Sequence, residues 1–190
     1  MTQVKCNDSP QCLLRNDTFK ESMPSLHECY QYTKASCCTT AHDEKIKDGL
    51  ISLVSDTCHE NFDDLLQYYC FGCYQSQPQY TDVKAKTIRI CKSFANRIWG
   101  GLETGDISKQ ADVFDNCGLN VDDKIVIQSK YFTDGTQFFA KVKPPFFEDY
   151  KVIIDEKDEN CYNFGLHRVS LQLSSLALMI VGLFGILNYL

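Results

Sequence analysis

The hydrophobic pattern separates the chain into a helical first part and a second part with short strands. Between residues 43 and 73, apolar residues recur at the three- and four-residue spacing of an amphipathic helix. They are Ile46, Leu50, Leu53, Val54, Phe62, Leu65, Leu66 and Tyr69. This spacing predicts two helices, or one helix interrupted near Cys58. Asp43 and Glu44 suit the first turn of such a helix.

A further helix is predicted over residues 83–99, after a loop over residues 74–81 that contains Pro78. One face of this helix would carry a set of mainly apolar residues: Val83, Thr87, Ile90, Cys91, Phe94 and Ile98. The pair Gly100-Gly101 would end it.

Beyond residue 100 the pattern changes from helical to extended. Residues 101–120 are predicted as loop, and the β-branched run 124–128 as a short strand. The pair Asp134-Gly135 lies between residues 130–132 and 137–142, which is a hairpin signal. Pro144-Pro145 ends that run, and residues 150–154 are predicted as another strand. The order predicts an α+β domain, helices first and then short antiparallel strands, ending near Cys161.

The cysteine content changes this picture most. The chain has 190 residues, 11 cysteines and a net charge of −6. Cytosolic proteins are kept reduced, so this density indicates a secreted or lumenal domain held by disulfides. The adjacent Cys37 and Cys38 are expected to bond to different distant partners, because a disulfide between neighbours is strained. Cys70 and Cys73 have a zinc-like spacing, but a matching second pair and clustered histidines are missing, so disulfides are favoured and no metal or cofactor is predicted.

Charge and motifs exclude several function classes. The acidic balance and the lack of a basic cluster argue against nucleic-acid binding. Cys58-His59, Asp63-Asp64 and Asp122-Asp123 do not form a catalytic constellation, so the sequence does not predict an enzyme. Two sequons, at Asn7 and Asn16, predict glycosylation on an extracellular protein.

Residues 169–190 form an uncharged hydrophobic tail long enough to span a bilayer. Because no Lys or Arg follows it, we interpret it as a GPI-attachment signal; a plain C-terminal membrane helix is the alternative. The attachment site would be one of four small residues: Asn163, Gly165, Ser170 and Ser174. The first residues lack the apolar run of a signal peptide, so we expect this start to lie within a longer precursor or to lack a first exon. Residues 1–165 would then form the extracellular domain.

The cysteine spacing resembles that of the folate receptor family, which includes folate receptors, riboflavin-binding protein and the egg receptor Juno. Cys29 followed by Cys37-Cys38 matches the family's C-x7-CC spacing. The segments YYCFGCY at residues 68–74 and CKSFANRIW at residues 91–99 resemble two further family motifs, with Ala95 in place of one cysteine. The resemblance covers residues 12 to 161 and rests on cysteine spacing more than on overall identity.

This resemblance implies a folate-receptor-like fold and a set of disulfides. The implied pairs are Cys12–Cys37 (with Cys6 the alternative partner of Cys37), Cys29–Cys70, Cys38–Cys73, Cys58–Cys117 and Cys91–Cys161. They leave one odd cysteine, which we expect to be Cys6.

The resemblance also implies where a ligand would bind. Tyr68 occupies the position of the family's pterin-binding aspartate, Tyr80 that of a pocket tryptophan, and Lys84 that of an arginine. With Trp99, these residues could hold a planar anionic ligand by stacking and charge. The alternative is that Trp99 belongs to the core and Lys84 to a solvated face.

Two hypotheses of function follow. The first is a cell-surface, GPI-anchored receptor for a small heterocyclic ligand such as a folate or a flavin. The second is an adhesion or recognition module that binds a protein partner and whose vitamin pocket has degenerated.

Overall fold

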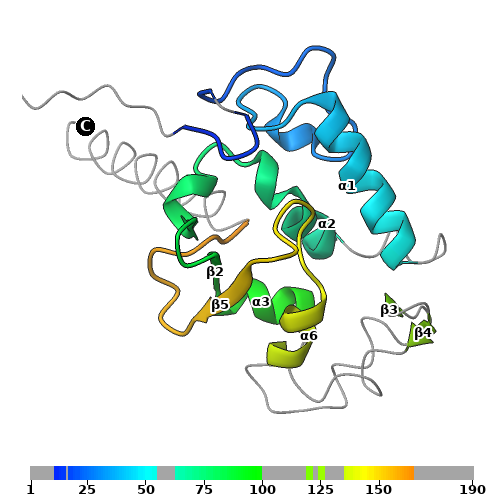
Figure 1. The fold of residues 1–190 in the computed structure, drawn as a ribbon, viewed down its shortest axis with the longest axis vertical. Coiled ribbons are helices and arrows are strands. Elements are labelled where there is room, and N and C mark those ends of the chain that lie inside the picture. Colours follow the sequence, from blue (N-terminus) through cyan, green and yellow to red (C-terminus); the bar gives the residue numbers. More distant parts are fainter. Residues whose placement is uncertain are drawn as a thin grey trace, which may run out of the picture.

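The computed structural model describes residues 11–15, 17–54, 63–99, 119–121, 124–126 and 135–164. Within these ranges the α-helices are α1 (Thr40–Leu53), α2 (Asp63–Tyr69), α3 (Lys92–Trp99) and α6 (Gly135–Lys141). The 3-10 helices are η1 (Tyr30–Tyr32), η3 (Cys70–Cys73) and η4 (Gln77–Tyr80). The strands are β1 (Thr81–Asp82), β2 (Thr87–Cys91), β3 (Leu119–Val121), β4 (Lys124–Val126) and β5 (Lys151–Asp155). Figure 1 shows how these elements are arranged.

The two helices predicted between residues 43 and 73 are confirmed as α1 and α2. At the start of α1 the backbone N–H of Thr39 donates to Nδ1 of His42, three residues later, which satisfies a donor outside the helix. Ile46 and Leu50 of α1 are buried, as is Leu65 of α2. The helical spacing of the apolar residues therefore defines the faces that the two helices bury.

Strand β2 lies at the centre of a three-stranded sheet in the order β1-β2-β5. It pairs antiparallel with β1, and it pairs in parallel with β5, from Thr87 opposite Lys151 to Cys91 opposite Asp155. The predicted strand at residues 150–154 is confirmed within one residue. The expectation of only antiparallel strands is wrong for the β2–β5 pair. A second, two-stranded sheet pairs β3 with β4 antiparallel, and β4 falls in the predicted run 124–128.

The predicted helix over residues 83–99 is wrong in its first half. Residues 87–91 form β2, and the helix begins only at Lys92. Ile88 and Ile90 are buried while Arg89 between them is exposed, which is the alternation of a strand. The helical spacing was misleading because β-branched residues here gain backbone hydrogen bonds from β5, a distant segment. The order of helices first and strands afterwards is also wrong, since β1 and β2 precede α3.

The predicted hairpin around Asp134-Gly135 is wrong for its second arm. Residues 135–141 form the helix α6; residues 130–132 lie outside the described ranges. Phe138 and Phe139 are adjacent and both buried. A strand would point them to opposite faces, whereas a helix can turn both into the core.

The predicted loop at residues 74–81 contains the short 3-10 helix η4. A proline lies near its first turn, where the missing N–H costs little.

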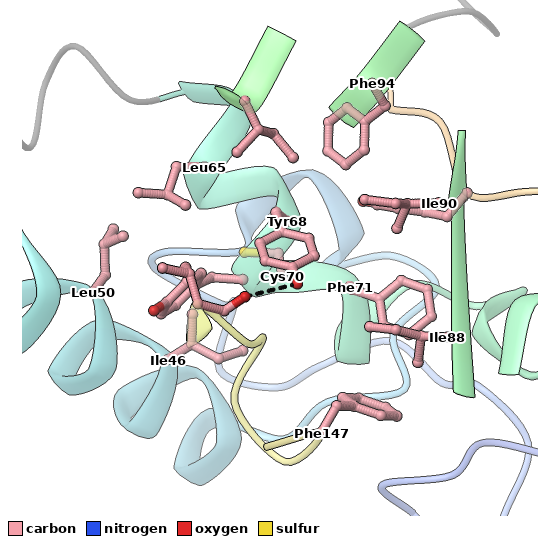
Figure 2. Packing of buried hydrophobic residues seen from close by; sticks show 14 of the residues in the cluster. Ile46, Leu50, Leu65, Tyr68, Cys70, Phe71, Ile88, Ile90, Phe94 and Phe147 are labelled. Atoms are coloured by element: carbon pink, nitrogen blue, oxygen red, sulfur yellow. Dashed lines mark hydrogen bonds between the residues drawn. The ribbon is translucent and has the colours of Figure 1, made fainter. Parts of the chain in front are cut away.

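One hydrophobic core lies between the helices and β2, as Figure 2 shows. In that view Leu50 and Leu65 lie on the side of α1 and α2, Ile88 and Ile90 on the side of β2, and Phe71 between them. Each fully buried side chain of this size contributes about 1.5–3 kcal/mol to folding. The core and the cysteines establish a disulfide-rich α+β domain.

Four disulfides join the described cysteines: Cys12–Cys37, Cys29–Cys70, Cys38–Cys73 and Cys91–Cys161. They are the same pairs that the family resemblance implies. The two neighbours Cys37 and Cys38 thus bond to different segments, the N-terminal arm and η3. The Cα separations of the four bridges lie between 4.6 and 5.6 Å, which is ordinary for disulfides.

Several predicted features lie outside the described residues. They are the pair Cys58–Cys117, the odd cysteine Cys6, the sequons at Asn7 and Asn16, and the tail at residues 169–190. Among the helices that the structure describes, none combines the length and the apolar character needed to cross a bilayer.

Candidate functional site

Two of the four residues expected to bind a ligand, Tyr68 and Trp99, lie in the core. Trp99 on α3 is 1% exposed and its ring centroid is 5.2 Å from that of Phe138. Tyr68 on α2 is fully buried, packs its ring against Phe139 and donates its hydroxyl hydrogen to the carbonyl of Val142 at 3.1 Å. Both side chains are therefore enclosed by the protein's own atoms.

The other two, Tyr80 and Lys84, lie apart from this pair. Tyr80 is half-buried and its ring is parallel to that of Tyr74, with centroids 6.3 Å apart. Burial raises the pKa of Tyr80. Lys84 is exposed in the turn between β1 and β2. The groove described next is lined by none of the four residues.

A groove lies beside the second half of α1. One pocket of about 360 Å³ and an adjoining one of about 310 Å³ share Leu53, Tyr69, Asn120, Lys143 and Glu148. We call the two together the α1 groove. Its walls come from four separate segments: α1, the end of α2, β3, and residues 140–148, which run from the end of α6 towards β5. A volume of this size suits a small organic ligand.

Gly49 of α1 lines the groove next to Pro145 and Tyr69. A Cβ atom at this position would lie 3.4 Å from Cγ of Pro145 and 3.6 Å from Cε1 of Tyr69. Both are ordinary van der Waals distances, so α1 packs closely against the 143–148 segment here and a methyl group would also fit. Phe146 forms one wall, and its ring meets the ring of His42 edge-on at 5.1 Å.

The charged groups of the α1 groove are mainly basic. The ammonium of Lys45 lies 5.8 Å from the ring centroid of Phe146, within the range of a cation–π contact. Lys143 is half-buried, and burial, followed by the charge of Lys151, lowers its pKa. The carboxylate of Glu148 accepts the backbone N–H of Phe146 at 3.0 Å.

Tyr69 adds a buried phenol to the same groove. Its pKa is raised, first by burial and then by the negative charge of Glu148, so the hydroxyl stays protonated. With Asn120 and Ser52 it provides neutral hydrogen-bonding groups beside Lys45 and Lys143. The α1 groove can thus offer cations, neutral polar groups and aromatic surface to one bound molecule.

Cys91, Asp158 and Cys161 have ligand atoms within 4.8 Å of one another, a spacing that a metal could use. The two sulfurs are bonded to each other, so neither is available as a thiolate. The Asp158 carboxylate instead accepts the N–H of Ser93 in the first turn of α3 at 3.0 Å. This cluster stabilises the start of α3.

A second surface feature is the loop at residues 22–33, which we call the 22–33 loop. The N–H of Ser22 donates to the carbonyl of Thr33 at 2.8 Å and closes the loop. The buried carboxylate of Asp43 on α1 accepts three backbone N–H groups from the loop, those of His27, Glu28 and Cys29. Met23 and Tyr30 are 83% and 67% exposed on it.

The residues of the α1 groove were missed by sequence reasoning. In the sequence, Lys45 is an ordinary polar position of a predicted helix, and Pro144-Pro145 indicates only the end of a predicted strand. The one available signal was the pair of aromatic residues, Phe146 and Phe147, directly after two prolines. Such a signal does not indicate which distant residues complete a pocket.

The described residues thus define a disulfide-rich α+β domain with a basic and aromatic groove beside α1. Comparison of the chain with protein-family models, curated proteins and solved structures finds no match. Membership of the folate receptor family therefore stays a prediction from the cysteine pattern.

Proposed function

We propose that this protein is a folate-receptor-like, non-enzymatic binding protein of the cell surface that holds a small heterocyclic ligand, such as a folate or a flavin. The observation that carries the proposal is the α1 groove. It offers Lys45, Lys143, Tyr69 and Phe146 around about 360 Å³. Ligand sites of this kind are concave and mostly apolar, with a few converging polar groups.

The burial of Tyr68 and Trp99 changes which residues would hold the ligand. Both side chains already fill space in the core, so neither can stack on a ligand without repacking. In our proposal the ligand contacts come instead from α1 and the 143–148 segment. The disulfide Cys29–Cys70 ties η3, directly after Tyr69, to the segment that precedes α1, and so helps to keep the groove's walls together.

Calorimetric titration with folate, reduced folates and riboflavin tests the proposal. Quenching of Trp99 is a poor readout, because this residue lies in the core rather than in the groove. We expect saturable binding of one ligand and its loss in Ser52→Trp, which adds a large side chain at an exposed position that lines the groove. The matched control is Lys47→Trp, on the same helix but outside the groove. Lack of binding by all these ligands to folded, disulfide-bonded protein contradicts the vitamin-binding proposal.

The proposed location is the extracellular face of the membrane, with residues 169–190 as a GPI-attachment signal. Support comes from the four disulfides, which persist in oxidising compartments, and from the uncharged tail. A phosphatidylinositol-specific phospholipase C would release such a protein from the cell surface. Retention after this treatment favours the alternative of a membrane-spanning helix.

The 22–33 loop favours a second candidate function, recognition of a cell-surface protein. It exposes Met23 and Tyr30 while Asp43 fixes its backbone. A fixed loop with exposed apolar side chains loses little conformational entropy when a partner binds. If Met23→Ser and Tyr30→Ser abolish adhesion of protein-coated beads to cells and Ser52→Trp does not, this second function replaces the first.

A further inference from the structure

Lys143 is a half-buried lysine of the α1 groove without an ion-pair partner among the described residues. Its side chain is half-buried, and none of the described carboxylates lies within ion-pair distance of its ammonium. Burying an ammonium without a partner is costly, because the group loses water contacts and gains no compensating charge. Burial lowers the pKa of Lys143 for this reason, and repulsion from the charge of Lys151 lowers it further. A bound anion would remove this penalty.

The carboxylate of the groove does not cancel its basic charge. Glu148 is exposed, and one of its oxygens accepts the N–H of Phe146. Lys45 lies on α1, with its ammonium over the ring of Phe146. The 360 Å³ pocket therefore holds two cations and one anion, and the adjoining pocket adds Lys141, so the α1 groove carries an excess of positive charge on a protein whose net charge is −6.

Apolar side chains line the same pocket as the two cations. Phe146, Pro145 and Leu53 line this pocket, together with Gly49, which adds no side chain to it. A flat apolar body could lie against Phe146 while an acid group at its edge reaches Lys143. The phenol of Tyr69 and the amide of Asn120 could supply further hydrogen bonds to that acid group.

We propose that the α1 groove selects organic carboxylates: a carboxylate paired with Lys143, carried on a flat apolar body that packs against Phe146 beside Lys45. This inference rests on the proposed function, since it assumes that the α1 groove is the ligand site. It adds that the affinity depends on the negative charge of the ligand as well as on its shape. Lys143 would contribute most of this dependence.

The test compares 2-naphthoate with 2-naphthamide, two probes of nearly equal shape of which only the first is charged. Dissociation constants are measured by ligand-observed NMR titration of the disulfide-bonded protein. We expect naphthoate to bind about tenfold more tightly than naphthamide, the equivalent of about 1.4 kcal/mol. Ser52→Trp should abolish the binding of both probes, which locates them in the groove.

Charge-removing variants assign the preference to individual lysines. Lys143→Gln should remove most of the tenfold difference, and Lys45→Gln, at an exposed position, should remove a smaller part of it. Lys47→Gln is the matched control, because this exposed lysine of α1 does not line the groove. It should leave the ratio of the two dissociation constants unchanged.

The outcomes separate this inference from the proposed function. Equal affinity for both probes, lost in Ser52→Trp, overturns selection by charge but leaves the groove as a binding site. An equal effect of Lys47→Gln and Lys143→Gln also overturns the inference, since it would reflect the general field of the protein. If neither probe binds and the vitamins also fail to bind, both proposals are wrong.

Discussion

A single buried carboxylate, that of Asp43 on α1, holds the backbone of the 22–33 loop. It is 4% exposed and accepts three backbone N–H groups, from His27 at 2.6 Å, Glu28 at 3.1 Å and Cys29 at 2.9 Å. One oxygen accepts the first two, and the other accepts the third. Replacing Asp43 with Asn keeps the size of the side chain but turns one acceptor into a donor.

The cost of Asp43→Asn can be worked out from these contacts. If the amide oxygen keeps the two bonds to His27 and Glu28, its NH₂ group faces the N–H of Cys29, which is buried and loses its partner. An unsatisfied buried donor costs about 1–3 kcal/mol, and the two remaining bonds lose the extra strength that a charged acceptor gives. We expect a total loss of about 2–4 kcal/mol of the free energy of unfolding. This loss is a large share of the free energy of unfolding of a typical domain, which is roughly 5–15 kcal/mol.

Urea unfolding of the disulfide-bonded protein measures this loss, with the fluorescence of Trp99 as the signal. Trp99 is the chain's single tryptophan and is buried, so its emission changes on unfolding. The matched control is Asp48→Asn, an exposed aspartate on the same helix, which should change stability by less than about 0.5 kcal/mol. If Asp43→Asn costs as little as the control, the 22–33 loop does not depend on Asp43.

Three further predictions concern stability, each measured by the same unfolding assay. Tyr162→Phe should cost about 1–3 kcal/mol, because the buried hydroxyl bonds to Tyr32 at 2.8 Å and to a backbone carbonyl at 3.1 Å; no change would show that these groups find other partners. Gly49→Ala should stabilise by about 0.5–1 kcal/mol, since glycine is unfavourable inside a helix and the new methyl group makes ordinary contacts. A loss of stability would mean that the 143–148 segment cannot accommodate it. The double variant Cys38→Ala with Cys73→Ala should cost about 2–4 kcal/mol, because this bridge closes a loop with a sequence separation of 35; an unchanged midpoint would contradict the pairing.

Two lysines of the α1 groove, Lys45 and Lys143, show why a binding site can escape sequence reasoning. Lys45 and Lys143 lie far apart along the chain, and each follows a pattern that is ordinary in its own segment. They approach the same space only because α1 packs against residues 143–148 at Gly49. The ligand site expected from the sequence is wrong for Tyr68 and Trp99. Their positions in the motifs indicate a ligand site, but the fold buries both side chains in the core.

The sequence by itself determined those features whose cause is local. The helices α1 and α2 follow from the three- and four-residue spacing of apolar side chains, and β5 follows from a short β-branched run. The α+β class and the use of disulfides follow from the same spacing and from the number of cysteines. Only the tertiary structure decided the state of residues 87–91 and 135–141. The first became a strand because β5 supplied its hydrogen bonds, and the second became a helix because Phe138 and Phe139 both had to be buried. The α1 groove belongs with these, since it exists only where segments distant in sequence pack together and leave space between them.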